Sequence, residues 1–152
     1  MARTPTRRDR SSDAVAPHFE FCVHGRPVSA QAHNRQRLNA WRNQVREAAI
    51  TAWPRDAPAL IVAVELWITH YAEKRFADMD NLIKPIQDAL QGTAYLDDSM
   101  VVDVTGSWRD INSWLPVRFM PLPLASAFSD GREFVHIRLW VTPSRQDLVD
   151  RI

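Results

Sequence analysis

The hydrophobic pattern of residues 19–54 predicts a strand followed by a helix. Residues 19–24 form a short apolar run that ends in the turn-forming residues 25–27, which indicates a strand. From Asn34 to Pro54 the apolar residues recur at spacings of three and four, which is typical of an amphipathic helix that packs one stripe on a sheet. The residues of that stripe are Leu38, Trp41, Val45, Ala48, Ala49 and Ala52.

The pattern beyond this helix predicts a second strand, a second helix and two final strands. Residues 60–71 are β-branched and nearly all apolar, as in a central strand that is covered on both faces. Residues 81–90 indicate a helix, and residues 101–108 and 133–141 indicate strands. The order strand, helix, strand, helix, strand, strand predicts an α/β fold of the α+β two-layer kind. We expect a small mixed sheet of about four strands with two main helices, in a single domain over residues 18–152.

Two segments fit this plan poorly. Pro85 lies inside the second helix and lacks a backbone donor, so we expect an irregular first turn around Asn81 or a regular helix that begins near Pro85. Residues 110–132 hold three prolines and many large apolar side chains without a clear period, which indicates an inserted loop. So apolar a loop is expected to pack on the body of the protein, on a partner subunit or on a ligand.

The composition favours a cytoplasmic protein. The single cysteine, Cys22, cannot form an intrachain disulfide, and its place in an apolar run indicates a buried strand thiol. No stretch approaches the roughly 18 apolar residues of a membrane span, and the polar N-terminal region has no apolar segment typical of a signal peptide. We therefore expect no membrane partner.

The formal net charge of +1 hides an uneven distribution. Residues 1–17 are typical of a disordered basic arm, and residues 1–12 carry four arginines against one aspartate, a net +3. The stretch Asp78–Asp103 holds six aspartates and one lysine, a net −5, which leaves +3 for the rest of the 152-residue chain. Because the acid is concentrated in one stretch, the near-neutral total does not exclude a nucleic-acid partner.

This acidic stretch admits two interpretations. Asp78 and Asp80 lie at the entry to the second helix, where an Asp is an ordinary N-cap and the helix dipole favours negative charge. Asp97 and Asp98 fall just before the next strand, and a short connection can bring that strand's start back toward the helix entry. Carboxylates about 4 Å apart repel by about 4 kcal/mol at an effective dielectric near 20, so the convergence of at least three requires a cation. Hard oxygen ligands select Mg²⁺ or Mn²⁺ rather than zinc.

Lys84 also has two interpretations. It lies one helical turn after Asp80 and one before Asp88, on a single helix face. It is either the middle of an ordinary salt-bridge ladder or a cation beside a metal–carboxylate site, suited to holding a phosphate or stabilising the charge of phosphoryl transfer. Spacing alone leaves both interpretations open.

The acidic motif as a whole resembles a known family. The run D-x-D-N-L-x-K-x-x-x-D-A-L over residues 78–90, followed by L-D-D-x-x-V over residues 96–101, resembles the RusA-type Holliday junction resolvases, small dimeric nucleases of bacteria and their phages. The likeness covers residues 19–108, and residues 133–142 more loosely, and includes a first strand that ends in Gly-x-Pro and an Arg-rich helix with a central Trp.

The resemblance implies a crossover junction endodeoxyribonuclease and a role for each acidic position. It implies that Asp78, Asp80 and Asp98 bind the catalytic Mg²⁺, with Mn²⁺ as a substitute. It also implies that Lys84 is the catalytic lysine. The further positions are Asp97, as an auxiliary metal ligand, and Asn81 and Asp88, which would support the site.

The residues and the resemblance agree on metal-assisted phosphodiester hydrolysis. A four-way junction has approximate twofold symmetry and needs paired nicks, so we expect a homodimer that offers two sites. The apolar loop is expected to extend the dimer interface rather than to place a wedge such as Trp114 or Phe119 at the junction centre. With the N-terminal arm, the residues expected to contact DNA phosphates are Lys74, Arg75, Arg35, Arg37, Arg42 and Arg46.

Two other functions stay open at this point. A protein with this fold can bind branched DNA without cutting it, and the near-neutral charge also allows a Mg²⁺-dependent hydrolase of a small phosphorylated substrate. Salt separates the last case from the other two, because affinity for DNA falls steeply as salt rises.

Overall fold

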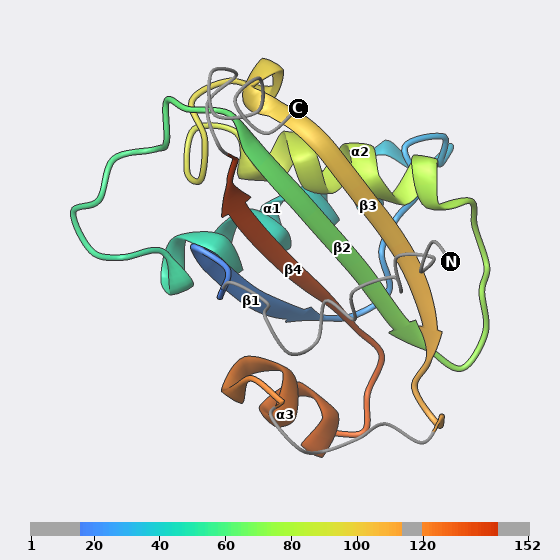
Figure 1. Ribbon diagram of the computed structural model, residues 1–152. Coiled ribbons are helices and arrows are strands. Elements are labelled where there is room, and N and C mark those ends of the chain that lie inside the picture. Colours follow the sequence, from blue (N-terminus) through green and yellow to red (C-terminus); the bar gives the residue numbers. More distant parts are fainter. Residues whose placement is uncertain (1–15, 114–119, 143–152) are drawn as a thin grey trace, which may run out of the picture.

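The computed structural model describes residues 16–113 and 120–142 (Figure 1). The predicted basic arm therefore lies, except for Ala16 and Pro17, outside the described residues. Within the described residues the elements are β1 (Phe19–His24), α1 (Arg35–Ala52), β2 (Val64–Ala72), α2 (Met79–Leu90), the short 3₁₀ helix η1 (Asp98–Met100), β3 (Val101–Asp110), α3 (Leu122–Ser129) and β4 (Phe134–Val141).

The four strands form one mixed sheet in the order β1-β4-β2-β3. β4 runs antiparallel to both β1 and β2, whereas β2 and β3 are parallel. A parallel pair needs a crossover connection, and α2 lies in that connection between β2 and β3. The predicted α+β fold with a four-stranded mixed sheet and two main helices is confirmed, with α3 as an additional element.

The main core lies between one face of the sheet and helices α1 and α2 (Figure 1). Alternate residues of β1, Phe19, Phe21 and Val23, are buried in this core. The stripe of α1 that the sequence predicts is buried at Leu38, Trp41, Val45 and Ala49. Its N-terminus is capped as a helix requires, because the Asn34 side chain accepts a hydrogen bond from the backbone N–H of Arg37.

The predicted central strand begins four residues later than expected, at Val64 instead of residue 60. Leu60 uses its backbone elsewhere: its N–H donates to the carbonyl of Ala94, and its carbonyl accepts from the N–H of Leu96. The segment before β2 thereby holds the connection between α2 and β3, and Ile61 stays 72% exposed.

Helix α2 corrects the expectation for Pro85. The helix begins at Met79 and continues through Pro85, so a start near Pro85 is wrong, whereas the first turn around Asn81 is irregular as expected: the N–H of Asn81 donates to the carbonyl of Asp78, only three residues back, at 3.1 Å. The missing N–H of Pro85 leaves the carbonyl of Asn81 without its helical donor. That carbonyl accepts instead from the N–H of Ala30, at 2.8 Å, which compensates for the proline and ties the segment before α1 to α2.

The predicted inserted loop contains helix α3, which the sequence analysis missed. A second apolar cluster of Tyr71, Phe134 and Ala127 holds α3 on the sheet, with Phe128 against both aromatic rings. The described part of the segment therefore packs on the body of the protein, as one of the expected alternatives has it. Trp114 and Phe119, the predicted wedge residues, lie outside the described residues.

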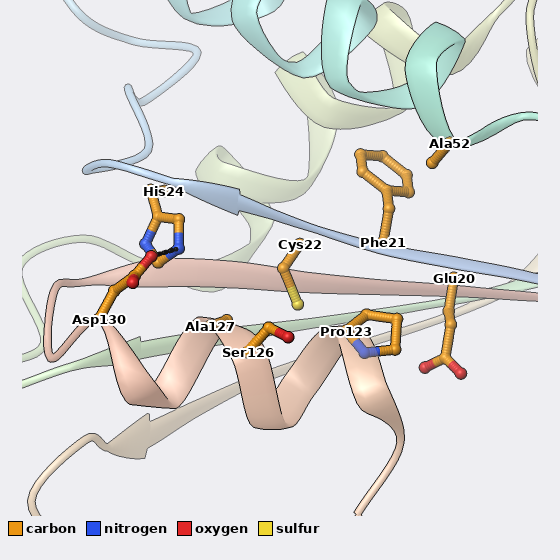
Figure 2. Close-up of a pocket in the computed structure, with 9 residues that line it drawn as sticks. All are labelled: Glu20, Phe21, Cys22, His24, Ala52, Pro123, Ser126, Ala127 and Asp130. Carbon is orange, nitrogen blue, oxygen red and sulfur yellow. Dashed lines mark ion pairs between the residues drawn. The ribbon is translucent and has the colours of Figure 1, made fainter.

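A cavity of about 290 Å³ lies between α3 and β1 (Figure 2). Its wall carries the ion pair of His24 with Asp130, whose Nε2 and Oδ2 are 3.0 Å apart, and the half-buried thiol of Cys22. Burial raises the pKa of that thiol to about 12, and Cys22 packs against the apolar cluster of Tyr71, Ala127 and Phe134. In the described part of the chain, no helix has both the length and the apolar character to cross a membrane.

Candidate active site on helix α2

Asp78 and Asp80 lie at the start of α2, just after the segment that connects it to β2. Asp78 occupies the N-cap position of α2, yet its side chain makes no capping hydrogen bond. Both side chains are exposed, and within the described residues neither has a hydrogen-bond or ion-pair partner. The capping interpretation of Asp78 is therefore wrong, and two hard oxygen donors remain free at this end of the helix.

Lys84 is held between two carboxylates from different parts of the chain. Its Nζ lies 2.9 Å from Oδ1 of Asp88, one turn later on α2, and 3.5 Å from Oδ2 of Asp98 on η1. Hydrogen bonding to Asp88 is the largest cause that raises the pKa of Lys84, so the ammonium stays charged. The salt-bridge ladder exists on the Asp88 side only, because within the described residues Asp80 makes no ion pair with Lys84.

Asp97 caps the short helix that precedes β3. Its Oδ1 accepts a hydrogen bond of 2.8 Å from the N–H of Ser99. That backbone donor is the largest cause that lowers the pKa of Asp97. One oxygen of the predicted auxiliary ligand is therefore engaged in local structure.

The sheet register decides where Asp98 arrives. Because β2 and β3 are parallel, the start of β3 pairs with the start of β2, Val101 opposite Val64, whereas α2 begins beyond the end of β2. The connection therefore brings Asp98 to Lys84, one helical turn after Asp80 on α2.

The predicted metal ligands have suitable chemistry, but their side chains are not prearranged around one point. The free carboxylate oxygens of Asp78 and Asp80 are ligands of the kind that a hard divalent cation binds, and so is the carboxylate of Asp98, which contacts Lys84. Among the residues described, however, no three or more His, Cys, Asp or Glu side chains are arranged to hold a metal ion. A metal role for Asp78, Asp80, Asp98 and Asp97 stays a prediction.

The predicted DNA-binding residues are not equally free. Lys74 and Arg75 are exposed in the segment between β2 and α2, three to six residues before Asp78 and Asp80 along the chain. Arg42 is instead half-buried and contacts Oδ2 of Asp88 through Nη2, at 3.5 Å. The remaining three lie on α1 as well: Arg35 donates to the carbonyl of Ala30 and Arg46 to Asn43, and Arg37 is exposed.

A cluster that no sequence pattern predicts supports the segment before Asp78. The buried His70 at the end of β2 donates through Nε2 to Oε2 of Glu133, at 2.8 Å, and packs edge-on against Phe76. Arg26 also binds Glu133 and lies over the Phe76 ring, 5.1 Å from its centroid. No local pattern could reveal this cluster, because Glu133 lies 63 residues from His70 in the sequence. His70 is 2% exposed, which is typical of a structural residue.

Comparison with known proteins supports the interpretation of this site. The family model described as Endodeoxyribonuclease RusA matches residues 20–116, from the second residue of β1 to beyond the end of β3, and this range includes every predicted site residue. No curated protein matches the chain. The family match covers more than half of the chain and agrees with the motif over residues 78–101. The chain therefore belongs to the RusA family of endodeoxyribonucleases.

Proposed function

We propose that this endodeoxyribonuclease resolves four-way DNA junctions by Mg²⁺-dependent hydrolysis at the entry to α2. The observation that carries the proposal is the pair of unengaged carboxylates at Asp78 and Asp80, because a helix N-cap Asp normally spends its side chain on the backbone. Membership of the RusA family supports branched DNA as the substrate.

The metal would be held by Asp78, Asp80 and Asp98, with Asp97 as a further carboxylate. When bound, Mg²⁺ supplies Lewis acidity to the scissile phosphate and lowers the pKa of water. Lys84 is charged and 53% exposed beside this site, so it can contact a phosphate oxygen and stabilise the negative charge of the transition state. Asn81 and Asp88, on the same helix, support these groups.

DNA would approach along the basic residues near the site, of which Arg46 is half-buried and the others are exposed. Lys74 and Arg75 precede the carboxylates by a few residues, and Arg35, Arg37 and Arg46 follow one another along α1. Positive charges in these places contact phosphates and fix the register of the substrate without reading its sequence. A homodimer would present two such sites to the two strands that a junction must have cut.

The decisive experiment is cleavage of a synthetic four-way junction by the Asp80→Asn variant, with linear duplex and flap DNA as comparison substrates. We expect Mg²⁺-dependent nicking by the wild type and a loss of at least about a hundredfold in the variant, with junction binding retained. Asp56→Asn is the matched control: Asp56 is exposed in the connection before β2 at φ 62°, a conformation that Asn adopts as readily as Asp. Unchanged cleavage by Asp80→Asn would contradict the proposed site.

The same assay separates the alternatives. Wild-type protein that binds the junction but nicks it in neither Mg²⁺ nor Mn²⁺ is a binding protein without catalysis. Protein whose affinity for the junction does not fall as salt rises lacks the phosphate contacts of a DNA enzyme, which favours a small phosphorylated substrate.

A further inference from the structure

We infer that Arg42 positions Lys84 through Asp88 and does not contact DNA. The inference rests on the proposed function, since it concerns the lysine of the proposed site. It assigns to Arg42 a role different from that of its neighbours on α1.

Asp88 links Arg42 to Lys84. Its carboxylate divides its two oxygens between two cations from different helices: Oδ1 faces Nζ of Lys84 at 2.9 Å, and Oδ2 faces Nη2 of Arg42 at 3.5 Å. Contacts at both oxygens restrict the rotation of a carboxylate. Arg42 therefore limits the direction in which Asp88 presents Oδ1 to Lys84.

The position of Arg42 supports this link. Its side chain is 29% exposed, and its Nε is buried without a hydrogen-bond partner in the described structure. Nη1 donates to Oδ1 of Asn39, on the preceding turn of α1, at 3.3 Å. A guanidinium held in this way between α1 and α2 presents little surface to a phosphate. It lies instead where it compensates the charge of Asp88.

Lys84 depends on Asp88 to keep its position. Lysine has a long flexible side chain, and this one is 53% exposed, so it needs an external restraint to keep one position. The contact with Asp98 is longer than that with Asp88, 3.5 Å against 2.9 Å, which leaves Asp88 as the main restraint. If Arg42 is removed, Asp88 can turn, and Lys84 loses its fixed direction toward the site.

The test compares Arg42→Gln with Arg46→Gln, which removes the same charge one helical turn later on α1. Two quantities are measured for each: the salt dependence of junction affinity in EDTA, and the single-turnover cleavage rate in Mg²⁺ at saturating enzyme. For Arg42→Gln we expect the wild-type salt slope, affinity within about twofold, and a cleavage rate lower by about tenfold or more. For Arg46→Gln we expect a slope smaller by about 0.9, as for one lost phosphate contact.

A double-mutant cycle tests that Arg42 acts through Asp88. The variant with both Arg42→Gln and Asp88→Asn should cleave no more slowly than the slower single variant, because both changes remove one restraint. Arg42→Lys, which keeps a cation near Oδ2 of Asp88, should recover part of the rate. Thermal unfolding of each variant shows whether a lower rate comes from lost folding.

The outcomes distinguish this inference from the proposed function. A smaller salt slope for Arg42→Gln, a rate loss that is additive with Asp88→Asn, or a rate loss that follows unfolding overturns the inference while wild-type cleavage upholds the function. A wild-type chain that cuts no DNA overturns both.

Discussion

At the scale of single residues, the sheet buries two histidines beside carboxylates. His136 and His70 are each 2% exposed in their side chains, and each donates through Nε2 to a glutamate, Glu20 and Glu133 respectively. Burial is the largest cause that lowers the pKa of both rings, against the opposite effect of the glutamates. Both rings are therefore neutral at pH 7 in the folded protein.

The lowered pKa of His136 predicts acid destabilisation. The unfolded ring binds a proton as the pH falls through about 6.5, whereas the folded ring, which faces Glu20 and Arg138, resists protonation to lower pH. The contribution of neutral His136 to the free energy of unfolding is thus fully present above pH 6.5. It is lost as the pH falls below 6.5, at up to about 1.4 kcal/mol per pH unit. In urea unfolding between pH 7 and 5, His136→Gln should lose less stability than the wild type, because Gln can still donate to Glu20 and does not titrate.

His33→Gln is the control for this measurement. His33 is exposed in the segment before α1 and has no partner in the described structure. The pH dependence of its unfolding should equal that of the wild type. If the stability of His136→Gln depended on pH as that of the wild type does, burial of His136 would not control acid stability.

At the scale of elements, helix termini and a helix proline determine how α1 and α2 meet. Pro85 frees the carbonyl of Asn81, and the N–H of Ala30 occupies it, so the segment that leads into α1 is attached to the helix that carries the candidate site. The next cap along this segment is Asn34, whose Oδ1 accepts from the N–H of Arg37 at 3.1 Å. The start of α1 therefore depends on the one side-chain cap that Asn34 provides.

Removal of this cap should cost stability without touching the core. We expect Asn34→Ala to lower the free energy of unfolding by about 0.5–2 kcal/mol, because one backbone N–H of the first turn loses its acceptor. The change is measured by urea or thermal unfolding. Asn43→Ala is the matched control: Asn43 is exposed inside α1, where Ala is the better helix former and only the 3.4 Å surface contact with Arg46 is lost, so it should be neutral or stabilising by a few tenths of a kcal/mol. Equal losses for the two variants would contradict the capping role of Asn34.

At the scale of the whole molecule, charge is divided between an acidic site and basic surroundings. The stretch Asp78–Asp103 carries a net −5, and the formal charge of the chain is +1. DNA phosphates are repelled by these carboxylates unless a cation lies between them. The near-neutral total is thus compatible with a DNA enzyme that binds a divalent cation together with its substrate.

This charge distribution predicts that a divalent cation raises junction affinity. We expect binding in Mg²⁺ to be tighter than in EDTA by about tenfold, equivalent to about 1.4 kcal/mol. Fluorescence anisotropy of a labelled junction measures it, and Ca²⁺, which takes the same oxygen ligands, is titrated in parallel.

The variant with both Asp78→Asn and Asp80→Asn is the informative comparison. It should bind the junction more tightly than the wild type in EDTA and gain little from metal, because the repelling charges are gone. If the wild type bound the junction with the same affinity in EDTA and in Mg²⁺, the carboxylates would have no effect on DNA binding.

Much of the fold and the family could be predicted from local patterns. The bounds of β1 agree with the predicted strand over 19–24, and the buried stripe of α1 is the one read from its spacing. Both follow from side-chain periodicity, which depends on neighbouring residues only. Helix α3 was missed because its eight residues are apolar on several sides and two prolines precede or begin it, so no period is visible.

The sequence by itself determined the order of the four strands and the two main helices, the acidic motif and the membership of the family, because these depend on residue identity and short spacings. Only the tertiary structure decided which groups meet: the parallel register brings Asp98 to Lys84, and the packing of α1 on α2 brings Arg42 to Asp88. These contacts join residues far apart in the chain, and their geometry follows from sheet order and helix packing, which no local pattern encodes.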